Sequence, residues 1–260
     1  MRSVRRPAVA GLFYPGDPRV LAETVDSFLA AGAPLEAIPK ALVAPHAGYV
    51  YSGGIAGLAY ATLAPARDRI TRVVLLGPVH RVPVRGLALP GCAALATPLG
   101  EIPVDAAAAA GLDRVVTRPD VHAEEHSLEV QLPFLQRALG DFAVVPLAVG
   151  DASAGEVAAV LDALWGGPET LIVVSSDLSH YHPYAVAKAR DAATIEAVLD
   201  LAGPIAHQQA CGATPLNGLL AAAPRHGLTP VLLGACNSGD TAGDRGRVVG
   251  YASFAFVEES

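Results

Sequence analysis

The chain has 260 residues, of which 52% are hydrophobic and 17% are charged, and its formal net charge at pH 7 is −7. This composition excludes a disordered chain, a collagen and a coiled coil, and it supplies enough apolar side chains for a substantial core. No apolar run approaches the about 18 residues of a membrane-spanning helix. Basic residues are scattered along the chain, so neither a membrane nor a nucleic acid is an expected partner.

The N-terminal segment and the cysteines indicate a cellular compartment. A basic start at residues 1–7 is followed by a Pro-Gly-Asp turn at residues 15–17 rather than by a sustained apolar segment. We therefore expect no secretory signal peptide and a cytoplasmic protein. The cysteines are odd in number and far apart, which is typical of reduced thiols, at Cys92, Cys211 and Cys236.

Apolar segments of strand length alternate with longer amphipathic segments, which is typical of an α/β protein. A first helix is predicted at 17–30, with Asp17 as its N-cap, and further helices at 127–139, 153–165, 184–201 and 215–223. Strands are predicted at 40–44, 72–76, 142–148, 170–175, 230–235 and 248–257. No linker divides the chain, so we expect residues 1–260 to form a single layered αβα domain with a mainly parallel central sheet.

Four of these predicted strands are followed by a side chain of the kind that binds metals. His46 follows the strand at 40–44, His80 the strand at 72–76, His180 the strand at 170–175, and Asp240 the strand at 230–235. Open α/β sheets build their sites at the carboxyl ends of the strands. The four side chains are therefore predicted to meet in one site although they come from different loops.

Imidazole and carboxylate groups bind divalent first-row metals, and two histidines with one carboxylate hold non-haem Fe(II) with open positions. The pattern favours such a metal site. Asp240 is either the carboxylate ligand or a turn residue that caps its own backbone. A second alternative for the three histidines is a buried hydrogen-bonded cluster without a metal.

The segment 122–129 contains two histidines four residues apart, a spacing found in zinc protease helices. Ala123 stands where that motif needs its catalytic Glu, and no third ligand follows. A protease site is not expected. His126 and Glu129 are predicted instead to face a substrate or to support the site.

Two further features favour structural roles. The glycine-rich segment 48–54 resembles a phosphate-binding loop only loosely and lacks both of the usual patterns. Cys211 and Cys236 belong to no CxxC pair, so each is predicted to be a small buried residue rather than a metal ligand.

Taken in chain order, six motifs resemble those of the Memo family. They are PAVAGLFYP at 7–15, APHAGYVYSG at 44–53, LGPVH at 76–80, EHSLE at 125–129, SSDLSH at 175–180 and NSGD at 237–240. The resemblance covers essentially the whole chain. It implies a layered αβα fold similar to that of class III extradiol ring-cleaving dioxygenases, with a site at one edge of the sheet.

The resemblance also implies roles for individual residues. His46 and His80 match the two metal-ligating histidines, and His180 matches a third site histidine, as a ligand or as an acid/base. Animal members carry Cys where this chain has Asp240, and here Asp240 would complete a set of two histidines and one carboxylate. The expected cofactor is a divalent metal, Fe(II) first, with copper or zinc as alternatives.

Two functions follow from this resemblance. The first is a metal-dependent, dioxygenase-like oxidoreductase that acts on a small aromatic substrate. The alternative is a non-catalytic binding or adaptor protein, because bacterial and archaeal members are described as one part of a set with an AMMECR-type protein and a radical SAM protein. A shared fold does not by itself decide between them.

Overall fold

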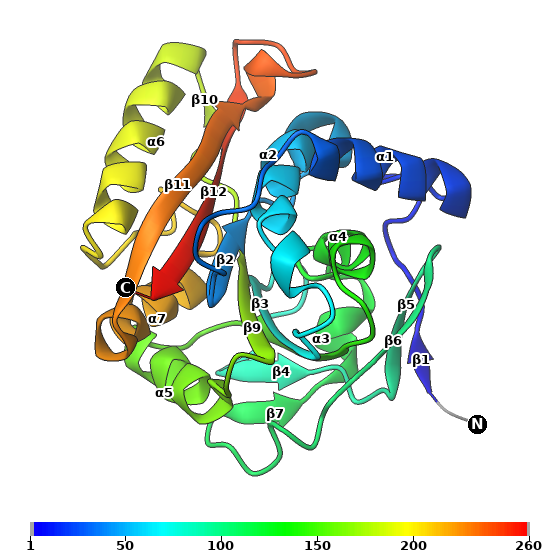
Figure 1. The fold of residues 1–260 in the computed structure, drawn as a ribbon. Coiled ribbons are helices and arrows are strands. Elements are labelled where there is room, and N and C mark those ends of the chain that lie inside the picture. The colour runs from blue at the N-terminus through cyan, green and yellow to red at the C-terminus, as the bar shows by residue number, and fades with distance from the viewer. Residues whose placement is uncertain (1–2, 259–260) are drawn as a thin grey trace.

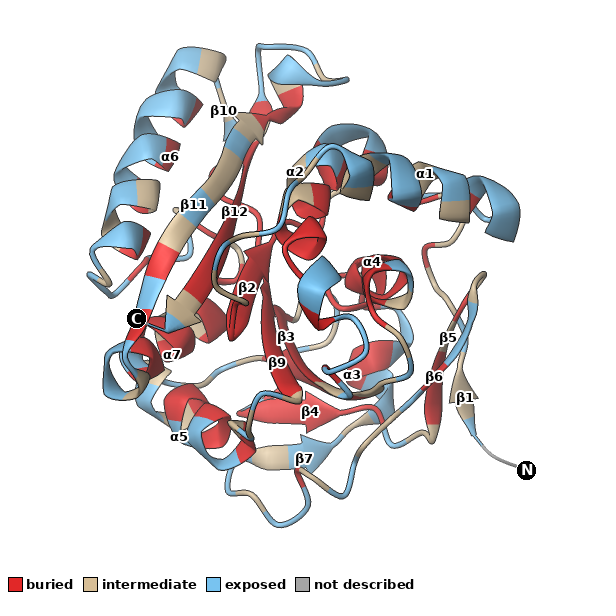
Figure 2. Ribbon diagram, viewed as in Figure 1, coloured by how far each residue is buried: buried red, intermediate tan, exposed pale blue. Residues whose placement is uncertain are grey.

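The structure is a computed structural model that describes residues 3–258. Four parallel strands form its centre (Figure 1). In spatial order they are β2 (Ala41–Ala44), β9 (Thr170–Ser175), β3 (Arg72–Pro78) and β8 (Ala143–Val149). Nearly every residue in these strands is buried (Figure 2). Burial on both faces explains why their sequences read as uninterrupted apolar runs, and all four strands were predictable from those runs.

The edges of this sheet are partly antiparallel. β12 (Val248–Glu258) pairs antiparallel with β2, and both β11 (Leu228–Asn237) and β10 (His180–His182) pair antiparallel with β12. At the other edge, β4 (Leu87–Leu89) pairs antiparallel with β8 and parallel with β7 (Val115–Thr117). The predicted α/β class is confirmed, but the sheet is mixed. β11 and β12 follow each other without a crossover helix, and such strands can pair only in the antiparallel sense.

Helices cover both faces of the sheet (Figure 1). Those on one face are α1 (Pro18–Ala30), α2 (Tyr49–Ala61) and α4 (Leu132–Ala138). Those on the other are α5 (Ala154–Leu164), α6 (Tyr184–Leu199) and α7 (Ala213–Ala222). Successive strand residues point to opposite cores, so Val173 joins the first core and Val174 the second. This is the predicted αβα layering.

Helix α2 is absent from the predicted elements because its glycines are typical of a loop. Two of them instead allow close packing against α1. A Cβ atom on Gly53 would lie 2.4 Å from the Phe28 ring, and one on Gly57 would lie 2.6 Å from the Phe28 carbonyl oxygen. Gly53 and Gly57 therefore serve helix packing, at the cost in helix propensity that glycine carries.

The helix predicted at 127–139 is observed in two pieces, the 3-10 turn η2 (Glu129–Gln131) and then α4. Gln131 is buried and donates from Nε2 to the Pro45 carbonyl at 2.9 Å and to Ser175 Oγ at 2.8 Å. Pro133 stands in the first turn of α4, where its missing N–H costs nothing. These contacts outweigh the regular helical periodicity of the leucines.

The remaining elements are short. They are α3 (Pro119–Ala123), the 3-10 turns η1 (Ala64–Ala66), η3 (Ala223–His226) and η4 (Ser238–Asp240), and a small sheet of β1 (Val4–Arg5), β5 (Ala94–Thr97) and β6 (Gly100–Pro103). Within residues 3–258, none of the helices has the length and apolar character that crossing a bilayer demands.

Candidate metal centre

The predicted site lies at the carboxyl ends of the central strands. His46 lies two residues beyond β2, His80 two residues beyond β3, and His180 in the segment that follows β9. All three line one cavity of about 540 Å³, together with His126. The structure therefore brings together four of the histidines that the sequence singled out.

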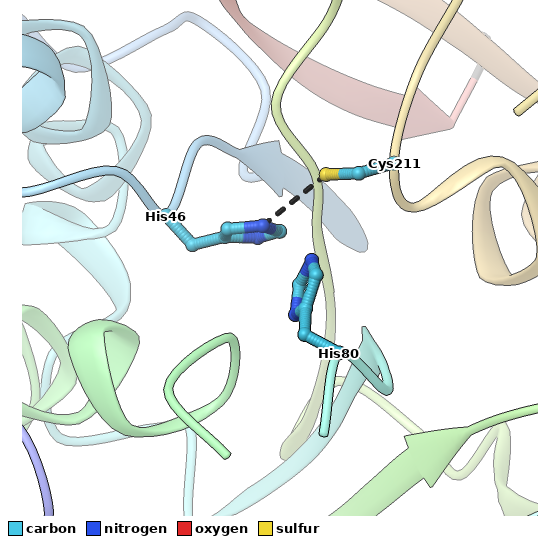
Figure 3. Close-up of side chains that lie close together, drawn as sticks. All are labelled: His46, His80 and Cys211. Atoms are coloured by element: carbon cyan, nitrogen blue, oxygen red, sulfur yellow. Dashed lines mark hydrogen bonds between the residues drawn. The ribbon is translucent and has the colours of Figure 1, made fainter. Parts of the chain in front are cut away.

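Cys211 joins these histidines from a fifth segment, the turn before α7. Its Sγ lies 3.2 Å from Nε2 of His46, and the two side chains point toward each other beside His80 (Figure 3). One donor atom from each of His46, His80 and Cys211 lies within 4.8 Å of the others. The sequence favoured a packing role for Cys211, and its position beside two histidines makes it a candidate ligand as well.

Gly212 makes this approach feasible. A Cβ atom at that position would lie 2.6 Å from the carbonyl oxygen of Ser175, so only glycine lets the turn pack against the end of β9. Cys211 and His46 are 165 residues apart in the chain. The only local signal for this contact is the Cys-Gly pair immediately before a predicted helix.

Hydrogen bonds determine which ring nitrogen of His46 faces the site. Ser175 Oγ donates to the Ser127 carbonyl at 2.7 Å, so it accepts from His46 Nδ1 at 2.9 Å. This arrangement leaves Nε2 of His46 as a lone-pair donor directed at Cys211. A fixed tautomer of this kind is typical of histidines that bind metals.

Glu125 orients His80 in the same way. Its carboxylate is 1% exposed and accepts the backbone N–H of His80, the ring Nδ1–H of His80 at 2.9 Å, and the N–H groups of His126 and Ser127. Burial acts to raise the pKa of Glu125, but the hydrogen bonds and charge of His80 outweigh it and lower the pKa to about 2. Glu125 is thus ionised at neutral pH. The sequence placed Glu125 between two histidines and at the start of the EHSLE motif, without a role of its own.

His46 and His126 are neutral imidazoles at neutral pH. Burial, followed by the charge of His80, lowers the pKa of His46 to about 3. Burial, followed by the charge of His46, lowers the pKa of His126 to about 4. The His126 ring stacks on His80 with centroids 4.6 Å apart. Histidines in this state offer free lone pairs at neutral pH, as metal ligands must.

The thiol of Cys211 is protonated in this environment. Burial, reinforced by the charge of Asp177, raises its pKa to about 12. The S–H group therefore donates to Nε2 of His46. Binding of a cation between these residues would release the thiol proton, because the thiolate is the form that ligates.

His180 and Asp177 form a second donor group with Cys211, with one atom from each within 4.8 Å of the others. His180 donates from Nδ1 to the Leu178 carbonyl at 2.8 Å, so its Nε2 is a proton acceptor. Asp177 accepts the backbone N–H of His46 at 2.7 Å, and burial raises the pKa of its carboxyl group. The geometry suits His180 either as a ligand or as an acid/base.

Asp240 lies apart from these donor groups. Its carboxylate accepts from the Tyr184 hydroxyl at 2.5 Å and from the Asn237 N–H at 3.0 Å, which closes the turn of η4. Across the described part of the chain, none of the three groups of closely spaced metal-type donors contains Asp240. The turn that the sequence offered as the alternative for Asp240 is the arrangement observed.

Glu129 anchors the N-terminal segment. The buried carboxylate pairs with Arg5, accepts the N–H groups of Ala8 and Val9, and accepts from the Tyr14 hydroxyl at 2.6 Å. Among the described residues, those lining the 540 Å³ cavity include His126 but not Glu129. The two glutamates of the EHSLE motif thus have different contacts. Glu125 accepts from His80 in the candidate site, and Glu129 holds the N-terminal segment.

Comparison with known proteins identifies the family of this chain. The family model described as "Memo-like protein" matches residues 5–255. A MEMO1 family protein of Methanosarcina barkeri is 37% identical over 96% of this chain and 98% of its own length. A MEMO1 family protein of Methanopyrus kandleri is 35% identical over 97% of this chain and 98% of its own length. One of Aquifex aeolicus is 36% identical over 98% of this chain and 99% of its own length. On these matches, which span nearly its whole length, the chain belongs to the Memo family.

Proposed function

We propose that the chain binds a metal ion through His46, His80 and Cys211. The observation that carries this proposal is the convergence of their donor atoms within 4.8 Å from three separate loops. The hydrogen bonds on Nδ1 of both histidines support it, because they leave Nε2 free for a ligand. Two imidazoles and one thiolate suit zinc, copper or iron.

The predicted Fe(II) site with Asp240 as the carboxylate is the competing ligand set. It requires Asp240 to leave its hydrogen bonds with Tyr184 and Asn237 and to move toward the histidines. A thiolate in place of the carboxylate shifts the preference toward softer metals. The two sets therefore differ both in the residue that matters and in the metal retained.

Cys211→Ser and Asp240→Asn discriminate between these ligand sets. We expect wild-type protein, purified anaerobically without tag or chelator, to carry about one equivalent of metal. We expect Cys211→Ser to lose most of it and Asp240→Asn to keep it, because of these two side chains it is the Cys211 thiol that lies beside His46. Elemental analysis for iron, copper and zinc provides the measurement.

The reverse order of loss in these two variants would assign Asp240 as the ligand. Wild-type protein that holds no metal and takes none up on reconstitution would contradict the proposal altogether. It would favour the hydrogen-bonded histidine cluster, in which added metal leaves the melting temperature of the wild type unchanged.

We further propose that the metal-loaded protein is an oxidoreductase of the dioxygenase type, with a small aromatic substrate. A redox-active metal at this site would supply the chemistry with O₂. His180 would accept or return a proton at Nε2, since its Nδ1–H is committed to the Leu178 carbonyl. His126 lines the same cavity and is a second neutral imidazole there.

Replacing His180 with Gln tests the acid/base role. We expect turnover to fall by about 100-fold while the metal content stays unchanged, because a positioned proton acceptor contributes at least that factor. Oxygen uptake is measured with a panel of catechols that includes protocatechuate and dihydroxyphenylacetate. Loss of metal in the same variant would make His180 a ligand instead, and wild-type protein that is inert toward the whole panel would contradict the oxidoreductase proposal.

A binding role with an AMMECR-type protein and a radical SAM protein is the second candidate. It is favoured by two exposed apolar side chains near the cavity, Leu12 at 81% and Val50 at 69% exposure. Both lie around a second hollow that shares Phe13 with the 540 Å³ cavity. Co-purification of either partner that is lost in Leu12→Asp but kept in the control Leu199→Asp, on α6, would support this role.

A further inference from the structure

We propose that the ligand of the 540 Å³ cavity is a planar ring carrying a carboxylate, with Arg247 binding the carboxylate at the cavity mouth. This inference names the substrate class of the site under the proposed function and rests on it. Three observations carry it, namely the aromatic walls, a cation without an ion-pair partner, and a strained residue that holds this cation in place.

The cavity walls are aromatic above the histidines. Phe13, Tyr51, Tyr181 and Tyr251 all line the cavity. Its volume lies within the range of small-molecule sites, about 300–1,000 Å³. Asp177 is the single carboxylate among the lining residues, and it is already bonded to the His46 backbone. These walls favour a flat, largely apolar body rather than a sugar or a polyamine.

Arg247 is the single arginine or lysine among the lining residues. The acidic groups on its own loop are committed elsewhere, because Asp240 is bonded to Tyr184 and Asp244 accepts the Gly246 N–H at 2.6 Å. Arg247 is not among the arginines that form ion pairs within residues 3–258, which are Arg5, Arg72, Arg114, Arg118, Arg137 and Arg225. Its guanidinium is thus available to an anion.

Tyr181 holds that guanidinium in place. The ring centre lies 5.1 Å from the Arg247 guanidinium carbon, a cation–π distance. Tyr181 has a φ of +61°, in the left-handed region that side-chain-bearing residues rarely adopt, and it sits at a register shift where β10 pairs with β12. Bulges of this kind redirect a side chain beside a site. Here the bulge presents a ring that is 62% exposed to the cation at the cavity mouth.

The charge of the whole chain sharpens this assignment. A net charge of −7 repels anions on average, so a single cation at the mouth selects for ligands that place an anionic group there. Guanidinium binds carboxylate through two parallel hydrogen bonds, which also orients the ring toward the histidines. A neutral analogue of the same shape loses that interaction.

Isothermal titration calorimetry with two matched probes tests the inference. The probes are 3,4-dihydroxybenzoate and its amide, which differ in charge but hardly in shape. We expect wild-type protein to bind the acid at least about tenfold more tightly than the amide. Arg247→Met should remove this preference. Arg245→Met is the control, because Arg245 lies on the same loop and stacks on Tyr184 at 4.6 Å but does not line the cavity.

Equal binding of acid and amide by the wild type, no binding of the acid, or equal losses in both variants would overturn the assignment. Titrations run on metal-free and metal-loaded protein, with metal content measured first, separate it from the proposed function. Protein that binds metal but shows no preference for the acid over the amide would support the metal site and reject the role of Arg247. A preference for the acid in protein that takes up no metal supports Arg247 and rejects the metal site.

Discussion

Replacing Glu125 with Ala is expected to lower metal affinity by about 10- to 100-fold and the free energy of unfolding by about 3 kcal/mol. The buried carboxylate accepts from the ring and backbone of His80 and from the backbone of Ser127. Its removal leaves these donors without an acceptor in a space that the folded chain shields from water, and it frees the His80 ring to rotate.

Chelator competition measures the affinity, and urea unfolding of the metal-free protein measures the stability. Glu124→Ala is the matched control, since the neighbouring side chain is exposed and removes one negative charge without removing the acceptor. Glu125→Gln separates the effect on metal affinity from the effect on stability. Its amide keeps one acceptor oxygen but places an NH₂ group against the remaining N–H donors. An alanine variant that binds metal as the wild type does would show that Glu125 does not position His80.

The second large effect is a loss of stability of the metal-free protein between pH 6.5 and about 4. Burial is the main cause that lowers the pKa of His46 to about 3 and those of His122 and His126 to about 4. In the unfolded chain these groups titrate near 6.5. As the pH falls through this window, these histidines bind protons in the unfolded state but not in the folded state. Stability is therefore complete above pH 6.5 and declines below it.

Two carboxyl groups oppose this trend. Burial raises the pKa values of Asp177 and Asp191, so the folded chain binds protons there before the unfolded chain does. Between pH 6.5 and about 5, where Glu125 stays largely ionised in the unfolded chain as well as in the folded one, the net uptake by the unfolded state then lies between one and three protons. We expect the free energy of unfolding to fall by about 1.4 to 4 kcal/mol per pH unit.

Urea unfolding in the presence of a chelator at a series of pH values from 7.5 to 4.5 measures this slope. His122→Gln is the informative variant, because His122 donates to the Ala88 carbonyl outside the metal cluster. Its slope should be shallower by about 1.4 kcal/mol per pH unit. A profile that stays flat from pH 7 to 5 would show that the histidines are accessible to protons in the folded chain.

Patterns in consecutive residues were enough to predict the layered fold and the sheet edge at which the candidate site lies. The strands β2, β3 and β9 are apolar runs because both of their faces are buried, and burial of this kind leaves a signal in consecutive residues. His46, His80 and His180 follow those strands directly, so the direction of the chain was enough to place them at one edge. The family motifs are likewise runs of consecutive residues, so they can be recognised from the sequence alone.

Which further side chains lie beside the histidines depends on contacts between distant segments of the chain. Cys211 reaches His46 across 165 residues because Gly212 fits against β9, and the Cys-Gly pair does not reveal in the sequence which residue it contacts. Asp240 is held by Tyr184, 56 residues away, rather than beside the histidines. Local periodicity and turn chemistry report the neighbours of a residue along the chain. Ligand sets, tautomers and buried carboxylates depend on neighbours in space, which exist only once the layers have packed.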